Sequence, residues 1–119
     1  MRLSDMSFEE SYNAELQIAP IADRILADEE TKHLFDHFYG TQDGERHNNA
    51  HLSITRLIRV HYHDLCEILA ILNACKTEDI KKQNRGEINE QLGEMMLDGD
   101  MMSFFLSSDC LAQAVQSAI

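Results

Sequence analysis

The sequence predicts an all-α protein, a single compact domain of about five to seven short helices. The chain has 119 residues and is 44% hydrophobic, a size and composition that suit one domain with a small core. Its apolar residues favour Leu, Ile, Ala and Met over Val and aromatic residues, and the chain holds one proline and five glycines. That balance favours helices over strands.

The first helix should begin near Phe8, because Ser7 and Glu10 supply the S-x-x-E pattern of a capping box. Apolar residues then recur at helical spacing, namely Phe8, Tyr12, Leu16, Ile18, Ile21, Ile25 and Leu26. Pro20 has no N–H to offer the carbonyl of Leu16, so a kink or a break is expected near Ala19.

A second short helix is expected over residues 28–40, with acids in its first turn and Gly40 as its stop. The polar stretch that follows predicts a loop near 41–49. The whole chain, 1–119, is expected to form one helical domain that carries this loop, because no linker, internal repeat or low-complexity tract interrupts it.

Residues 50–62 fit a period of two as well as a period of 3.6, and helix is the preferred interpretation. The helical stripe continues through Leu65, Ile68, Leu69 and Leu72, which predict a buried ridge on a central helix. Cys66 and Cys75 should pack against this ridge as small apolar residues.

Further helices should follow the central one. Thr77 is expected to cap the next helix, on which Asp79, Lys81 and Lys82 should face water. The remaining stretch predicts two or three helices, divided at Gly99 and capped at Asp100 and, further along, at Asp109.

Composition and charge exclude several classes of protein. The formal net charge of -11, from 21 acids and 10 bases, would repel nucleic acid phosphates. No apolar run approaches the roughly 20 residues that span a bilayer, and the acidic start does not fit a signal peptide. We therefore expect a cytoplasmic chain with no nucleic acid or membrane partner. The three cysteines have no C-x-x-C spacing and should be reduced and mostly buried.

The histidines and cysteines predict neither a metal site nor a catalytic site. His33 and His37 are spaced i, i+4, as are His47 and His51, but no third ligand converges and the H-E-x-x-H pattern is absent. Cys66 or Cys75 with His63 as a base would lack the setting that lowers a thiol pKa. No glycine-rich phosphate loop occurs either. We expect no catalytic residue, no cofactor and no metal.

A methionine–phenylalanine cluster near the end of the chain is the candidate for binding another protein. It consists of Met95, Met96, Met101, Met102, Phe104 and Phe105. Methionine is the adaptable side chain of surfaces that accept more than one shape. The preferred interpretation is that the cluster closes the core, with part of it, Met96 and Met102, left for a partner.

Four segments together resemble a known family. They are "LSDMSFEES", "IAPIADRILADEE", "DLCEILAILNACKTEDIKKQN" and "MMSFFLSS". In that order and at those separations they resemble the small tail assembly chaperones of long-tailed (siphovirus-type) bacteriophages and related prophages. The chain departs from the family pattern between Gly40 and His51 and again at His61 to His63, where the partner surface of the family would be altered.

The resemblance implies an α-helical protein without catalytic activity that binds the tape measure protein and helps recruit tail tube subunits. It also implies a place in the host cytoplasm and absence from the mature virion, and it leaves self-association open. The alternative is a small acidic helical inhibitor or adaptor of phage origin that acts on a host complex.

Overall fold

The computed structural model describes residues 2–36 and 55–105, and every regular element within these ranges is a helix. The all-α prediction is therefore confirmed. The elements are η1 (Leu3–Asp5), α1 (Phe8–Leu26), α2 (Glu29–Asp36), α4 (Tyr62–Leu72), α5 (Thr77–Lys81), α6 (Arg85–Leu97) and α7 (Gly99–Phe105). Residues 55–60 are also helical. The expected polar loop near 41–49 lies outside the described residues.

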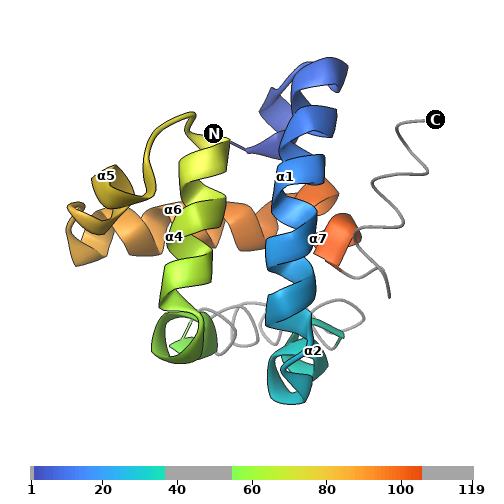
Figure 1. Cartoon of the computed structure of the whole chain (residues 1–119). Coiled ribbons are helices and arrows are strands. Elements are labelled where there is room, and N and C mark those ends of the chain that lie inside the picture. The colour runs from blue at the N-terminus through green and yellow to red at the C-terminus, as the bar shows by residue number, and fades with distance from the viewer. Residues whose placement is uncertain (1, 37–54, 106–119) are drawn as a thin grey trace.

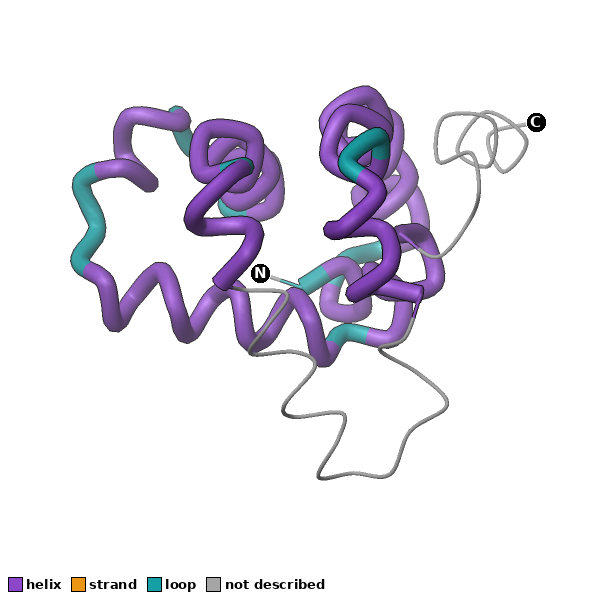
Figure 2. The backbone as a smooth tube through the Cα atoms, turned by 90° about the horizontal axis from the view of Figure 1, so that it is seen from below, coloured by secondary structure: helices purple, strands orange, loops and turns teal. Residues whose placement is uncertain are grey.

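The two helices α1 and α4 lie side by side and run in opposite directions, as Figure 1 shows. Helix α6 crosses behind this pair, and the view from below in Figure 2 places it along one side of both. Helix α7 follows directly and, with η1, packs against α1. The start of α1 is thus flanked by an element from each end of the described chain.

Helix α1 begins where the sequence predicts it. The backbone N–H of Glu10 donates to Ser7 Oγ over 3.2 Å, and the N–H of Ser7 donates to the Glu10 carboxylate over 3.4 Å, which completes the capping box. Of the kink or break expected near Ala19, the break is wrong, because the helix continues through Pro20 to Leu26. Pro20 lies on the exposed face, where water can bond to a carbonyl that has lost its helical partner.

The core face of α1 is narrower than the apolar spacing suggests. Its buried residues are Ala14, Ile18, Ala19, Ile21, Ala22 and Ile25. Phe8 and Leu16 also follow the helical spacing, but they are 77% and 37% exposed. Together with the half-buried Tyr12, these two residues follow i, i+4, i+8 and form a separate apolar stripe beside the core face.

The buried ridge on α4 is confirmed, since Leu65, Ile68, Leu69 and Leu72 are all at most 5% exposed. Cys66 is buried as predicted, but Cys75 is exposed, which corrects the expectation that it packs in the core. The reason is local: α4 ends at Leu72, and the chain turns through Ala74, whose φ of 52° is in the left-handed region. Cys110 lies outside the described residues.

Two predicted caps are displaced by a residue or two. Helix α5 begins at Thr77, and its N-cap is Lys76. Helix α7 is preceded by the buried Asp98, whose carboxylate accepts a hydrogen bond from the N–H of Asp100 over 3.1 Å, so Asp98 takes the capping role expected of Asp100. The predicted exposure of Asp79, Lys81 and Lys82 is confirmed. Asp109 lies outside the described residues.

Asp98 also ties the two ends of the described chain together. Its carboxylate accepts a bond from the backbone N–H of Ser4 over 3.4 Å and another from the Ser4 hydroxyl. The Ser4 hydroxyl also lies 3.0 Å from a carboxylate oxygen of Asp100. These contacts hold η1 against the start of α7 and fix the position of Leu3, which is 2% exposed.

Candidate protein-binding groove

The methionine–phenylalanine cluster does not form an exposed surface, although one member, Phe104, lines the groove described below. All six of its side chains are buried, with exposed fractions of at most 3%, and this confirms the preferred interpretation that they close the core. The exposure expected of Met96 and Met102 is wrong, since both are 0% exposed. Spacing along α6 and α7 could not reveal this, because an apolar face that packs on the core has the same period as one that binds a partner.

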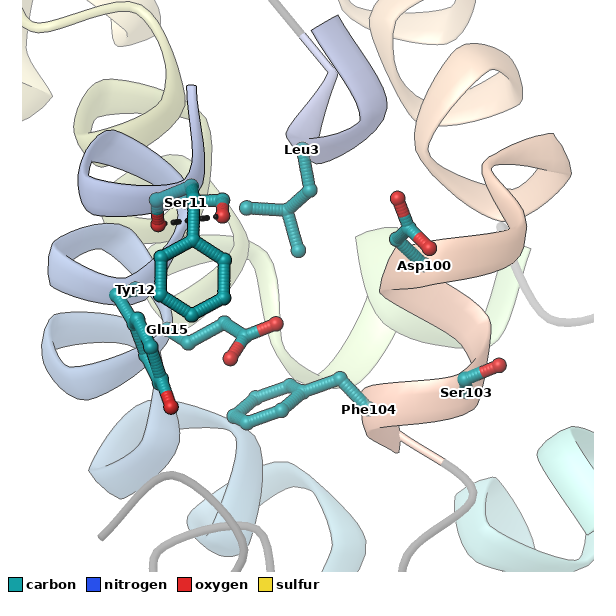
Figure 3. Close-up of a pocket in the computed structure, with 8 residues that line it drawn as sticks. Leu3, Ser11, Tyr12, Glu15, Asp100, Ser103 and Phe104 are labelled. Atoms are coloured by element: carbon teal, nitrogen blue, oxygen red, sulfur yellow. Dashed lines mark hydrogen bonds between the residues drawn. The ribbon is translucent and has the colours of Figure 1, made fainter. Parts of the chain in front are cut away.

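The most exposed large apolar side chain of the described residues, Phe8, lines an open groove on the surface. Figure 3 shows this groove and labels the other residues that line it. The groove encloses about 340 Å³. One wall comes from α1 and consists of Phe8, Ser11, Tyr12 and Glu15. The other wall comes from α7 and η1 and consists of Asp100, Ser103, Phe104 and Leu3.

Helical spacing places these side chains together. The α1 residues follow i, i+3, i+4, i+7 and the α7 residues follow i, i+3, i+4, so each helix presents one continuous strip to the groove. The rings of Phe8 and Tyr12 meet edge to face with their centroids 4.5 Å apart. Figure 3 shows Leu3 entering from above and the ring of Phe104 extending from α7 toward α1. The result is a groove between two helical rims, with a floor of the apolar residues Leu3, Tyr12 and Phe104 and an exposed lining that is more polar than apolar.

The polar groups of the groove carry one sign of charge. Glu15 and Asp100 both line it, whereas no lysine, arginine or histidine is among its described lining residues. Burial raises the pKa of the Glu15 carboxyl above its ordinary value, and the nearby charge of Asp100 raises it further. The groove therefore combines apolar contact area with a negative potential.

Sequence reasoning named only Phe104 among the groove-lining residues as a candidate for protein binding, and it did not find the groove itself. One signal was present: Ser11 and Glu15 lie on the same helical face as Phe8 and Tyr12, and a strip of mixed apolar and polar residues is unusual for a core. The contribution of Leu3 and α7 could not be seen from spacing within α1.

Two other hollows open beside α1 and α4. One is lined by Met6, Ala14 and Ile71 among other residues, and the second by His63, Glu67 and Cys75 among others. Neither contains a phenylalanine or tyrosine among its described lining residues. Aromatic side chains supply much of the binding energy at protein interfaces, so the groove beside Phe8 is the stronger candidate.

A cluster of charged side chains joins the start of α2 to the helical residues 55–60. The Asp28 carboxylate accepts hydrogen bonds from Arg56 over 2.8 Å, from His61 Nε2 over 2.9 Å and from the Thr31 hydroxyl over 3.0 Å. Arg56 also pairs with Glu30 over 3.0 Å. The hydrogen bond from Arg56, aided by those from His61 and Thr31, lowers the pKa of Asp28 far below its ordinary value. Because these bonds already engage the carboxylate, it serves as a link between elements and not as a base.

Acid should weaken this link. The pKa of Asp28 is lowered on folding, so the carboxylate stabilises the folded chain above the unfolded pKa of about 4, and this contribution is lost as the pH falls below that value. The free energy of unfolding, measured by urea titration, should therefore decrease between about pH 5 and about pH 3, on either side of the ordinary Asp pKa. Asp28→Asn should flatten this decrease relative to Glu90→Gln, an exposed substitution that changes the net charge equally. Equal slopes would contradict the role of Asp28.

The remaining histidines and cysteines of the described ranges do not converge. No group of three or more potential metal ligands occurs among the described residues. His33 is exposed, His63 pairs with Glu67 over 2.7 Å, and His37, His47 and His51 lie outside the described residues. Burial raises the pKa of the Cys66 thiol, which disfavours the thiolate that a nucleophile requires.

Comparison with models of protein families, with curated proteins and with solved structures gives no match. Within the described part of the chain, none of the helices is both long enough and apolar enough to cross a membrane.

Proposed function

We propose that this chain is a protein-binding module without catalytic activity, which acts as a tail assembly chaperone of the bacteriophage type. In this role it binds amphipathic helical segments of a tape measure protein and helps recruit tail tube subunits around them. The resemblance of its four segments to such chaperones supports the identity of the partner, and the groove beside Phe8 supports the mode of binding.

The observation that carries the proposal is the exposure of Phe8 at the rim of a groove that has both apolar and acidic residues in its lining. The side chain is 77% exposed, yet it lies beside the half-buried Tyr12 and the buried Leu3 and Phe104. An aromatic side chain in water next to a preformed apolar floor gains contact area when a partner covers it. Two helical rims with a floor between them provide the arrangement that accepts an amphipathic helix.

The size of the groove fits a helix that lies over it. A volume of about 340 Å³ accommodates a few side chains from one face of a partner helix and leaves the rest of that helix outside. Contacts of this kind are individually weak. A chaperone that covers a long helical protein needs many such contacts along its partner, and each must tolerate a different sequence.

The groove would also serve the alternative, a small acidic inhibitor or adaptor that acts on a host complex. A basic partner would suit the chain in either role, because Glu15 and Asp100 line the groove and the formal net charge is -11. A test with the tape measure protein separates the two proposals, since only the chaperone should keep that protein soluble.

The test is co-expression with the tape measure protein of the same genome. The wild-type chain should keep it soluble, and Phe8→Gln should lose most of this effect, because removal of an aromatic anchor typically weakens binding by about tenfold or more. Phe8 is mostly exposed, so this substitution should change the free energy of unfolding by less than about 0.5 kcal/mol.

The control is Leu97→Gln, which removes another exposed apolar side chain, 56% exposed, from the end of α6 outside the groove. This variant should retain the full activity. If the two variants behave alike, Phe8 is not the anchor. If the wild-type chain keeps no part of the tape measure protein soluble, the chaperone proposal must be abandoned.

A further inference from the structure

The two carboxylates of the groove lie on opposite walls. Figure 3 shows the Glu15 side chain extending from α1 across the groove toward α7, which carries Asp100. One carboxylate oxygen of Asp100 lies 3.0 Å from the Ser4 hydroxyl, which also bonds to Asp98. No hydrogen bond or ion pair joins Glu15 to any described residue. A partly buried acid thus extends over an apolar floor with a second acid nearby and no described cation beside it.

We propose that the groove selects helices that carry a lysine or arginine among their apolar residues, and that this cation binds between Glu15 and Asp100. The inference rests on the proposed function and specifies which partner segments the groove accepts. It assigns to Glu15 and Asp100 a binding role that is separate from the apolar contact with Phe8.

The electrostatic argument begins with Glu15. Its carboxylate is partly removed from water, and the negative charge of Asp100 lies close enough to disfavour its ionised form. A single positive charge placed between the two acids would relieve this repulsion and replace the lost hydration with charge-assisted hydrogen bonds. The free energy of binding the cation would therefore be more favourable here than beside an exposed acid elsewhere on the chain.

The rings beside the two carboxylates favour a side chain as the cation. Phe8, Tyr12 and Phe104 line the groove together with Glu15 and Asp100. Lysine and arginine carry their charge on a long apolar stem, which can pack on the rings of Phe8 and Tyr12. These rings also attract a cation placed over their faces.

The test compares two synthetic helical peptides of about 18 residues, built from Leu, Ala and Gln with one central lysine or with glutamine in its place. Fluorescence anisotropy gives the Kd of each. The lysine peptide should bind the wild-type chain about five to ten times more tightly, an advantage typical of a hydrogen bond to a charged group. Higher salt should reduce this advantage without abolishing binding.

The variant pair Glu15→Gln and Asp100→Asn, introduced together, should bind both peptides equally while circular dichroism shows an unchanged helical content. The matched control is Glu78→Gln with Glu90→Gln, which removes the same charge from exposed positions on α5 and α6. The control should keep the preference for lysine. If it loses the preference as well, the effect belongs to the overall negative charge and the inference is overturned.

The remaining outcomes separate this inference from the proposed function. If the wild-type chain binds both peptides equally and Phe8→Gln weakens both, the groove binds apolar helices without selecting a cation, and only the inference fails. If neither peptide binds while the tape measure protein still stays soluble on co-expression, the inference is again overturned and the function stands. If the wild-type chain does not keep the tape measure protein soluble on co-expression, the proposed function itself is contradicted.

Discussion

Replacing Met96 and Met102 together by aspartate should unfold the chain. Both side chains are 0% exposed, so the variant loses their apolar contacts and must also place two carboxylates in the core. Loss of a buried methionine costs about 2–5 kcal/mol, and a buried unpaired charge costs several more. The sum is as large as or larger than the roughly 5–15 kcal/mol that stabilises a domain of this kind. Circular dichroism and NMR dispersion would reveal the loss.

Leu97→Asp is the control for this experiment, since Leu97 follows Met96 directly but is 56% exposed. This variant should stay folded with a small change in the free energy of unfolding. A folded double variant with wild-type stability would show that the methionines are accessible, and that the cluster could bind a partner after all.

Leu69→Ala should lower the free energy of unfolding by roughly 2–5 kcal/mol, the cost of removing a large side chain from a packed core. Leu69 is 2% exposed and belongs to the buried ridge of α4, which faces α1. Urea titration monitored by circular dichroism measures the change through the shift of the midpoint.

Glu67→Ala, on the same helix, provides the comparison. The Glu67 carboxylate lies 2.7 Å from His63 and 3.7 Å from Arg24, but these are surface pairs. Their loss should cost at most about 1 kcal/mol. Equal effects of the two substitutions would mean that Leu69 does not lie on the buried face of α4.

The sequence predicted the helices well because their signals are local. The capping box at Ser7 and Glu10 and the ridge from Leu65 to Leu72 depend on residues within a few turns of one another. The choice of helix for the ambiguous stretch up to Tyr62 is confirmed for its described part, residues 55–60, before the chain bends at His61.

The errors arose where a residue's environment is supplied by distant parts of the chain. Period alone could not decide which of two apolar stripes on α1 faces α4, and Phe8 and Leu16 are in fact exposed. The cap of α7 is Asp98 because Ser4, far away in the sequence, also bonds to it. The groove needs η1, α1 and α7 together, and spacing within one helix cannot reveal such a site.

The central claim, that the groove between α1 and α7 binds a partner helix, is tested most directly by NMR of the isotope-labelled chain with a soluble tape measure segment. Chemical shift changes should concentrate at residues 8–15 and 100–104, which border the groove, and should be small on α5 at the opposite end of the fold. Phe8→Gln should reduce these changes in proportion to its weaker binding. Changes centred on α5, or on the hollow lined by His63 and Cys75, with none beside Phe8, would contradict the account.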